Sequence, residues 1–105
     1  MIEIDKVSGI GEFEKKTEEI PRENYTETRN VYSVNGKVFL VVNKNTFEMR
    51  CDGKLAKLLR EKYESVMDSR YFGRGGIEVV DSGQLEDDEV ADLIRLSYNL
   101  TSGQE

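Results

Sequence analysis

Histidine and tryptophan are absent from the 105 residues, and the chain has only one proline and one cysteine. The missing histidine excludes the Ser-His-Asp and Cys-His nucleophile pairs, the histidine general base and every zinc site that uses imidazole. The single cysteine, Cys51, has no partner for an internal disulfide, which is typical of a reducing compartment. These absences favour a cytoplasmic protein that is not an enzyme.

Long apolar runs are absent as well. No stretch reaches the roughly 18 apolar residues that a membrane span needs, so we expect no membrane association. The first residues, Met1–Asp5, lack the basic and apolar regions of a signal peptide. A chain of this length is typical of one domain, and we expect residues 1–105 to form a single domain and a monomer.

Positive charge is scarce overall and unevenly distributed. The formal net charge is -6, whereas nucleic-acid-binding domains are usually basic. Residues 44–74 carry a net charge of +3, and residues 75–105 carry -7. The middle segment is therefore the one basic part of the chain.

The clearest structural pattern begins at Val31. Val31–Val34 and Lys37–Val42 flank Asn35-Gly36, which favours a type I′ turn and predicts a β-hairpin. Residues 46–51 then alternate, so we expect a third antiparallel strand at the centre of the sheet. Its expected inward residues are Phe47, Met49 and Cys51, and its expected outward residues are Thr46, Glu48 and Arg50.

The segments after this meander predict two helices and two short strands. Asp52 is a good cap for a helix over residues 53–64, whose apolar stripe comprises Leu55, Leu58, Leu59 and Lys62. Strands are expected at Val66–Phe72 and Ile77–Val80, joined by a Gly73–Gly76 turn. A last helix is expected over 86–100, with Val90, Leu93, Ile94 and Ser97 on its core face and with acids in its first turn.

The two ends of the chain give weaker patterns. In residues 2–11 the apolar spacing is helical, but Gly9 and Gly11 would end a helix early. Residues 12–30 are compatible with one or two edge strands and a loop. Residues 101–105 are expected to be a frayed tail. The fold class predicted from all segments is α+β, with an antiparallel sheet and helices packed on one side.

Several of these pieces are familiar in their order and spacing. They are the strand pair VYSVNGKVFLVV, the segment FEMRCD before a leucine-bearing helix, and the closing IEVVDSGQLEDDEVADLIRLSYNL. From Val31 to Leu100 the chain resembles the MmcQ/YjbR-like family of small bacterial proteins. The TfoX N-terminal domain shares the Gly-Lys-x-Phe hairpin but fits the closing segment less well. Residues 1–30 match the family poorly, and Gly75-Gly76 stand where the family commonly has a tryptophan.

This resemblance implies a fold that has been likened to a double-wing DNA-binding arrangement and to frataxin. Phosphate neutralisation drives DNA binding, so we examine the basic segment for candidate contacts. The candidate nucleic-acid-binding residues are Lys37, Lys44, Arg50, Lys54, Lys57, Arg70 and Arg74. They predict weak, salt-dependent binding to DNA. The alternatives are an ordinary solvated surface, or a protein- or small-ligand-interaction module with a pocket between sheet and helices.

Other motifs favour plain structural roles. Cys51 is expected to be a buried small hydrophobe, because no histidine is present to activate it. The acids around Asp88 and Asp92 suit a helix N-terminus better than a metal site. Gly73–Gly76 lacks the Lys-Ser/Thr pair of a P-loop. We expect no metal, no cofactor and no catalytic residue.

Overall fold

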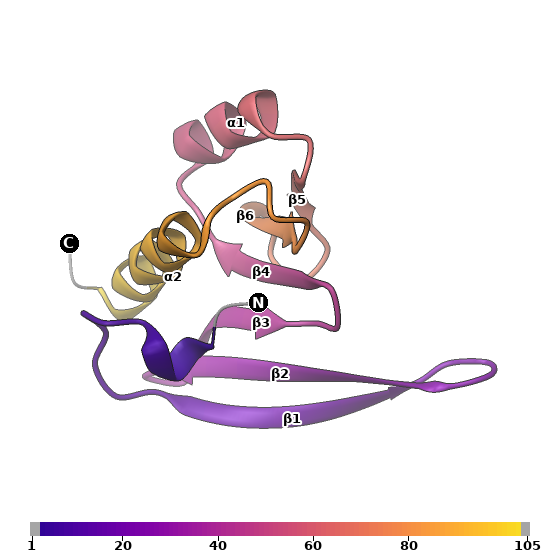
Figure 1. Cartoon of the computed structure of the whole chain (residues 1–105). Coiled ribbons are helices and arrows are strands. Elements are labelled where there is room, and N and C mark those ends of the chain that lie inside the picture. Colours follow the sequence, from indigo (N-terminus) through magenta and orange to yellow (C-terminus); the bar gives the residue numbers. More distant parts are fainter. Residues whose placement is uncertain (1–2, 104–105) are drawn as a thin grey trace.

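The computed structural model describes residues 3–103, and within them six strands form one antiparallel sheet (Figure 1). The order is β1-β2-β3-β4-β6-β5, so the last two strands exchange places relative to the chain. The strands are β1 (Glu14–Pro21), β2 (Thr26–Val34), β3 (Lys37–Val42), β4 (Thr46–Arg50), β5 (Val66–Ser69) and β6 (Gly73–Val80). The helices are η1 (Ile4–Lys6), a 3-10 turn, α1 (Gly53–Lys62) and α2 (Asp87–Ser102).

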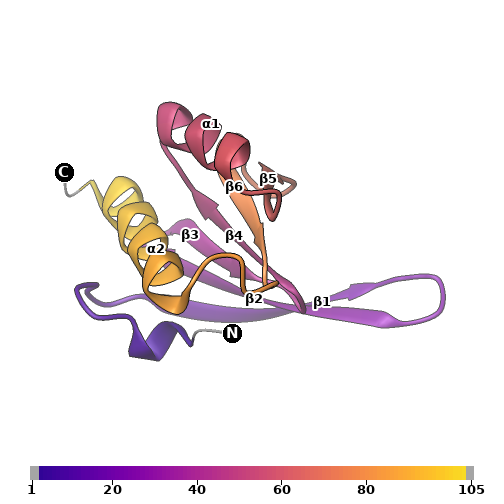
Figure 2. The ribbon, with the colours of Figure 1, turned by 45° about the horizontal axis from the view of Figure 1, so that its top comes forward.

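Both α-helices pack against one face of the sheet, with α2 over β3 and β4 and with α1 beside β5 and β6 (Figure 2). The core between them contains Leu40, Phe47 and Met49 from the strands and Ile94 from α2. Ser97 joins the layers, because its hydroxyl donates to the Phe39 carbonyl at 2.6 Å and accepts from the Arg50 amide at 2.9 Å. The α+β class with helices on one side is therefore confirmed.

The central hairpin and the capped helices form where the sequence predicts them. Asn35 and Gly36 both have positive φ, at 53° and 78°, as a type I′ turn requires. The Asp52 side chain accepts a hydrogen bond from the Leu55 amide and caps α1. Glu86 and Glu89 form a capping box at the start of α2.

The N-terminal third contains two strands, the larger of the two numbers that the sequence allowed for residues 12–30, and the second of them continues into the predicted Val31–Val34 strand. Strands β1 and β2 pair from Glu14↔Ser33 to Pro21↔Thr26 and form a long hairpin arm that projects past the rest of the sheet (Figure 1). Before it, η1 ends early, with Gly9 at φ 82°, as the glycine predicts.

The predicted glycine turn is wrong, because Gly73–Gly76 belong to β6 and the turn consists of residues 70–72. A Cβ at Gly76 would lie 2.5 Å from the Met49 carbonyl oxygen and 2.7 Å from the Phe72 Cβ. Gly76 is thus required for the close approach of β6 to β4 and to the turn, not for chain reversal.

The predicted stripe on α1 is also partly wrong. Leu58 is 62% exposed, and Ala56 is the residue of this helix that is buried in the core. Leu55 and Leu59 pack against the core from its margin. The short helix therefore packs on the sheet through Ala56 at the centre of its contact, with Leu55 and Leu59 at the margin.

The C-terminal expectations need a small correction. Helix α2 continues through Thr101 and Ser102 and ends at Gly103, which has φ 79°. Thr101 is buried, and its hydroxyl donates to the Ser97 carbonyl at 2.8 Å. The frayed tail predicted from residue 101 is therefore wrong for residues 101 and 102, while residues 104 and 105 lie outside the described chain.

Candidate functional site: a polar groove on the helix-free face

The face of the sheet that carries no helix is built around one row of side chains that crosses all six strands. Register partners place Lys16, Val31, Val41, Glu48, Glu78 and Met67 in this row. We call this side the helix-free face. Val31 and Val41 are buried although both α-helices pack on the other face, and the β5–β6 turn is hydrogen-bonded to Glu48 in the same row.

Glu48 anchors that turn. Its carboxylate accepts hydrogen bonds from the Ser69 hydroxyl at 2.9 Å, the Tyr71 amide at 2.8 Å and the Asn43 side chain at 2.8 Å. The residue is only 2% exposed, so the prediction that Glu48 faces solvent is wrong. The alternation of β4 places it away from the helices as expected, but the turn covers it there.

Burial alone would raise the pKa of Glu48. The hydrogen bonds from Asn43, Tyr71 and Ser69 and the charge of Arg70 outweigh that effect, and the pKa of Glu48 is lowered from its ordinary value. The carboxylate is therefore ionised and fully engaged at neutral pH. This is the behaviour of a structural group rather than of a general acid.

A second buried carboxylate, Glu78, lies directly opposite Glu48 in the sheet and is also 2% exposed. Like charges in that position repel. Arg70 compensates for Glu78 by donating from Nε at 3.1 Å and from Nη2 at 2.9 Å to its two carboxylate oxygens. These bonds raise the pKa of Arg70 and fix the plane of its guanidinium.

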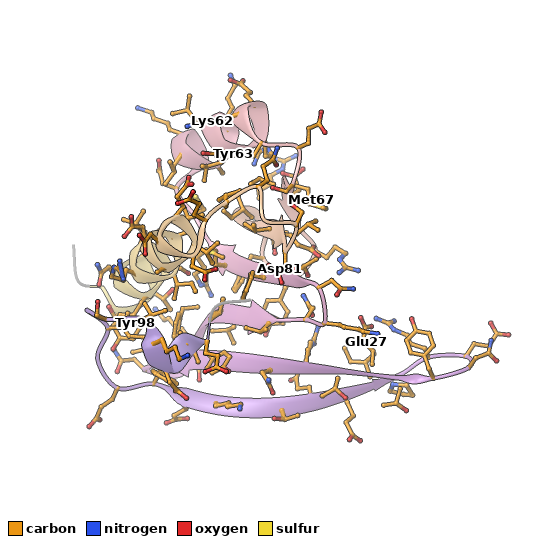
Figure 3. The ribbon with its side chains drawn as sticks, viewed as in Figure 1. Glu27, Lys62, Tyr63, Met67, Asp81 and Tyr98 are labelled. Carbon is orange, nitrogen blue, oxygen red and sulfur yellow. The ribbon has the colours of Figure 1, made fainter. Side chains whose placement is uncertain are left out.

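Arg70 keeps most of its side chain in solvent. The side chain is 70% exposed, and the pair with Glu78 uses two of its five N–H donors. Arg70 borders a groove of about 690 Å³ between the hairpin arm and the β3–β4 turn. The groove is lined by Tyr25, Thr26, Glu27, Thr28, Asn43, Lys44, Asn45, Thr46 and Arg70. In Figure 3 the labelled Glu27 lies between the arm and the turn.

Both walls of the groove are held by local hydrogen bonds. At the tip of the arm, the Arg22 amide donates to the Tyr25 carbonyl at 2.8 Å, and the Arg22 guanidinium binds Glu27 at 2.7 Å. In the opposite wall, the Asn43 amide donates to the Thr46 carbonyl at 2.9 Å. These turns leave Tyr25 64% exposed at one rim and Lys44 exposed at the other.

A smaller hollow of about 310 Å³ adjoins the groove and shares Glu27, Asn43 and Arg70 with it. Tyr71 borders this hollow, with the Arg29 guanidinium 5.2 Å from the centre of its ring. Arg29 also donates to Glu18 at 2.8 Å. The helix-free face thus combines guanidinium groups, carboxylates and exposed aromatic rings.

The structure distributes the seven candidate nucleic-acid-binding residues over three places. Lys44 and Arg70 meet at the groove. Lys54 and Lys57 are exposed on α1, which packs on the other face. Lys37, Arg50 and Arg74 lie at the end of the sheet that carries the Asn35-Gly36 turn. Of these, Arg50 is engaged internally, donating to the Val38 carbonyl at 2.8 Å and lying over the Phe72 ring.

Cys51 is buried, as predicted. Desolvation and the neighbouring charge of Asp52 raise the pKa of its thiol to about 11, so it is protonated at neutral pH. Among residues 3–103 no group of three or more Cys, Asp or Glu side chains is arranged to hold a metal ion. No helix within the same range has both the length and the apolar character to cross a membrane.

Comparison with protein families matches the chain to the YjbR family over residues 12–100. The chain belongs to the YjbR family. The match confirms the resemblance drawn from residues 31–100, and it extends that resemblance through the hairpin arm. Comparison with curated proteins and with solved structures gave no match.

Several residues of this YjbR-family groove escape sequence reasoning. Tyr25 of the groove and Arg22 and Arg29 of the adjoining hollow lie outside the basic middle segment, and the β1–β2 hairpin arm brings them beside it. One signal did exist, because Glu78 interrupts an otherwise apolar run in β6. A charged residue in such a run indicates a buried partner, here Arg70.

Proposed function

We propose that this YjbR-family protein is a non-enzymatic module that binds single-stranded nucleic acid weakly in the groove of its helix-free face. The observation that carries the proposal is the meeting of Lys44 and Arg70 with the exposed ring of Tyr25 at one groove. Cationic groups that follow a phosphate backbone, with aromatic rings on which bases stack, are the usual elements of such sites.

The groove suits a single strand better than a duplex. Tyr25 is exposed at its rim and Tyr71 at the adjoining hollow, and base stacking on such rings needs unpaired bases. Both α-helices lie on the opposite face, so neither is presented beside the groove for insertion into a major groove. The proposal therefore narrows the predicted DNA contact from the whole segment 44–74 to the part that borders the groove.

The local charge also explains why binding should be weak. Glu27 lies in the groove beside the basic groups, and the chain as a whole carries -6. Few phosphates can be neutralised, so affinity should fall with salt along a shallow slope, about -0.7 per phosphate contacted for a single strand.

The test is a fluorescence-anisotropy titration of a labelled oligothymidine and of a duplex of the same length, at low and at physiological salt. The variant is Lys44→Glu, and Lys54→Glu is its control because it makes the same charge change on the other face. We expect Lys44→Glu to weaken binding by about tenfold, and Tyr25→Ala to weaken it further, with Lys54→Glu close to wild type.

Two results would contradict the proposal. One is no binding of the single strand by the wild-type chain at low salt. The other is equal loss in Lys44→Glu and Lys54→Glu, which would indicate general charge repulsion rather than a site. Either result would favour the alternative, an interaction module for a protein or a small polar ligand, and the hydroxyl and amide groups of Thr26, Thr28 and Asn45 are suited to such a ligand.

A further inference from the structure

Strand β1 is an outer edge of the sheet. It pairs with β2 alone among the described strands, and Figure 1 shows no other strand beyond it. It is eight residues long, and most of its side chains are exposed. A strand of this kind has a row of backbone groups available for pairing with another chain.

The hydrogen bond that closes the hairpin defines which backbone groups point outward. The Arg22 amide donates to the Tyr25 carbonyl, so this pair is a hydrogen-bonded one. Such pairs alternate along an antiparallel ladder with pairs that are not hydrogen-bonded to each other. The register of β1 with β2 then makes Lys15, Thr17 and Glu19 members of pairs that are not hydrogen-bonded to each other. The backbone N–H and C=O groups of these three residues therefore face the free edge of the sheet.

Two further observations agree with this assignment of the outward-facing backbone groups of β1. Pro21 is also in a pair that is not hydrogen-bonded to its partner, so its nitrogen faces the free edge and its missing N–H removes no hydrogen bond between β1 and β2. Thr17 and Asn30 are opposite one another, and their side chains are close enough for a 2.8 Å hydrogen bond, as expected in pairs whose backbones are not hydrogen-bonded to each other.

The charges of β1 are complementary to those of a second β1 running in the opposite direction. If the two strands are related by a two-fold axis at Thr17, Lys15 of each copy faces Glu19 of the other, and Lys16 faces Glu18. A two-fold axis at Lys16 would instead place Lys16 against Lys16, and one at Glu18 would place Glu18 against Glu18. The Thr17 register also pairs the outward-facing N–H and C=O groups of residues 15, 17 and 19 with each other.

We propose that β1 is an interface for a second copy of this chain, and that two copies join edge to edge through β1 in the Thr17-centred antiparallel register. The two sheets then form one continuous sheet. This differs from the monomer expected from the sequence, and it does not depend on the proposed nucleic-acid site, because Lys44 and Arg70 are not on β1.

The first test is sedimentation equilibrium of the wild-type chain and of Thr17→Pro across a wide concentration range. Proline is tolerated in an edge strand where the N–H faces outward, as it is at Pro21, so the variant should keep its fold, checked by circular dichroism. We expect a concentration-dependent dimer for the wild type and only monomer for Thr17→Pro. A wild-type monomer at every concentration, or an unchanged dimer in Thr17→Pro, would overturn the proposal.

The second test exchanges the charges of one pair. Lys15→Glu alone and Glu19→Lys alone should each weaken self-association by about tenfold, because like charges then face each other twice. Mixing the two variants should restore association to the wild-type level as a heterodimer, since every facing pair is again opposite in sign. Lys54→Glu, on α1, controls for the change in net charge. A mixture no tighter than its separate components would contradict the register.

Discussion

The two faces of the sheet are buried by different means. On one face, α2 and α1 cover Leu40, Phe47 and Met49 with apolar side chains. On the other, Val41 is buried next to Glu48, whose carboxylate holds the β5–β6 turn through hydrogen bonds. The first face depends on apolar area and packing, and the second depends on hydrogen bonds to buried charges. The difference explains why a groove with polar walls is found on the second face.

Truncation of a core residue on the helix-covered face should have the largest effect. We expect Phe47→Ala to lower the free energy of unfolding by about 3–5 kcal/mol, because it removes a fully buried ring and leaves a cavity. Urea denaturation followed by circular dichroism measures this. A loss below about 1 kcal/mol would show that the helices do not supply the main apolar core.

Removal of the Glu48 carboxylate should have the next largest effect. In Glu48→Ala, the Tyr71 amide, the Ser69 hydroxyl and the Asn43 amide group lose their acceptor. We expect a loss of about 2–3 kcal/mol, and a smaller loss in Glu48→Gln, which keeps one acceptor oxygen. Amide hydrogen exchange should increase at residues 69–72 and not on α2. Equal exchange rates in the two proteins at residues 69–72 would contradict the anchoring role.

The acid stability of the two faces should differ as well. Because the pKa of Glu48 is lowered in the folded chain, its contribution is complete above the ordinary value of 4.5 and is lost as the pH falls through the lowered value. Urea midpoints from about pH 3 to about pH 7 should therefore converge for wild type and Glu48→Gln at the acid end. The surface variant Glu61→Gln is the control, and a constant wild-type advantage across this range would disprove the assignment.

A hydrogen bond at the exposed margin of the helical layer should have the smallest effect. The Tyr63 hydroxyl donates to Glu89 at 2.9 Å and joins the end of α1 to α2, and Figure 3 labels Tyr63 beside Lys62. We expect Tyr63→Phe to change the free energy of unfolding by less than about 0.5 kcal/mol, since the bond is exposed to water. A loss above about 1 kcal/mol would place the junction of the helices among the main stabilising contacts.

The sequence predicts elements that depend on local chemistry. The Asn35-Gly36 turn, the Asp52 cap and the core face of α2 follow from neighbouring residues, and all three are confirmed. The predictions fail where a segment that is distant in the sequence determines the conformation or the burial of a residue. Gly76 is required by the Met49 carbonyl on another strand, and Glu48 is buried by a turn more than twenty residues away. The groove could be predicted only in part for the same reason. The sequence predicts the arm that forms one of its walls only as one or two edge strands with a loop, and no local pattern places it beside the β3–β4 turn.

The carboxylate of Glu48 also has a consequence for the order in which the chain folds. Its hydrogen bonds reach across 5, 21 and 23 residues of sequence, so the longer two can form only after β4, β5 and β6 have assembled. Contacts that close late contribute little to the folding transition state. Loss of this carboxylate should then accelerate unfolding far more than it slows refolding, and the groove should be the last surface to form and the first to open.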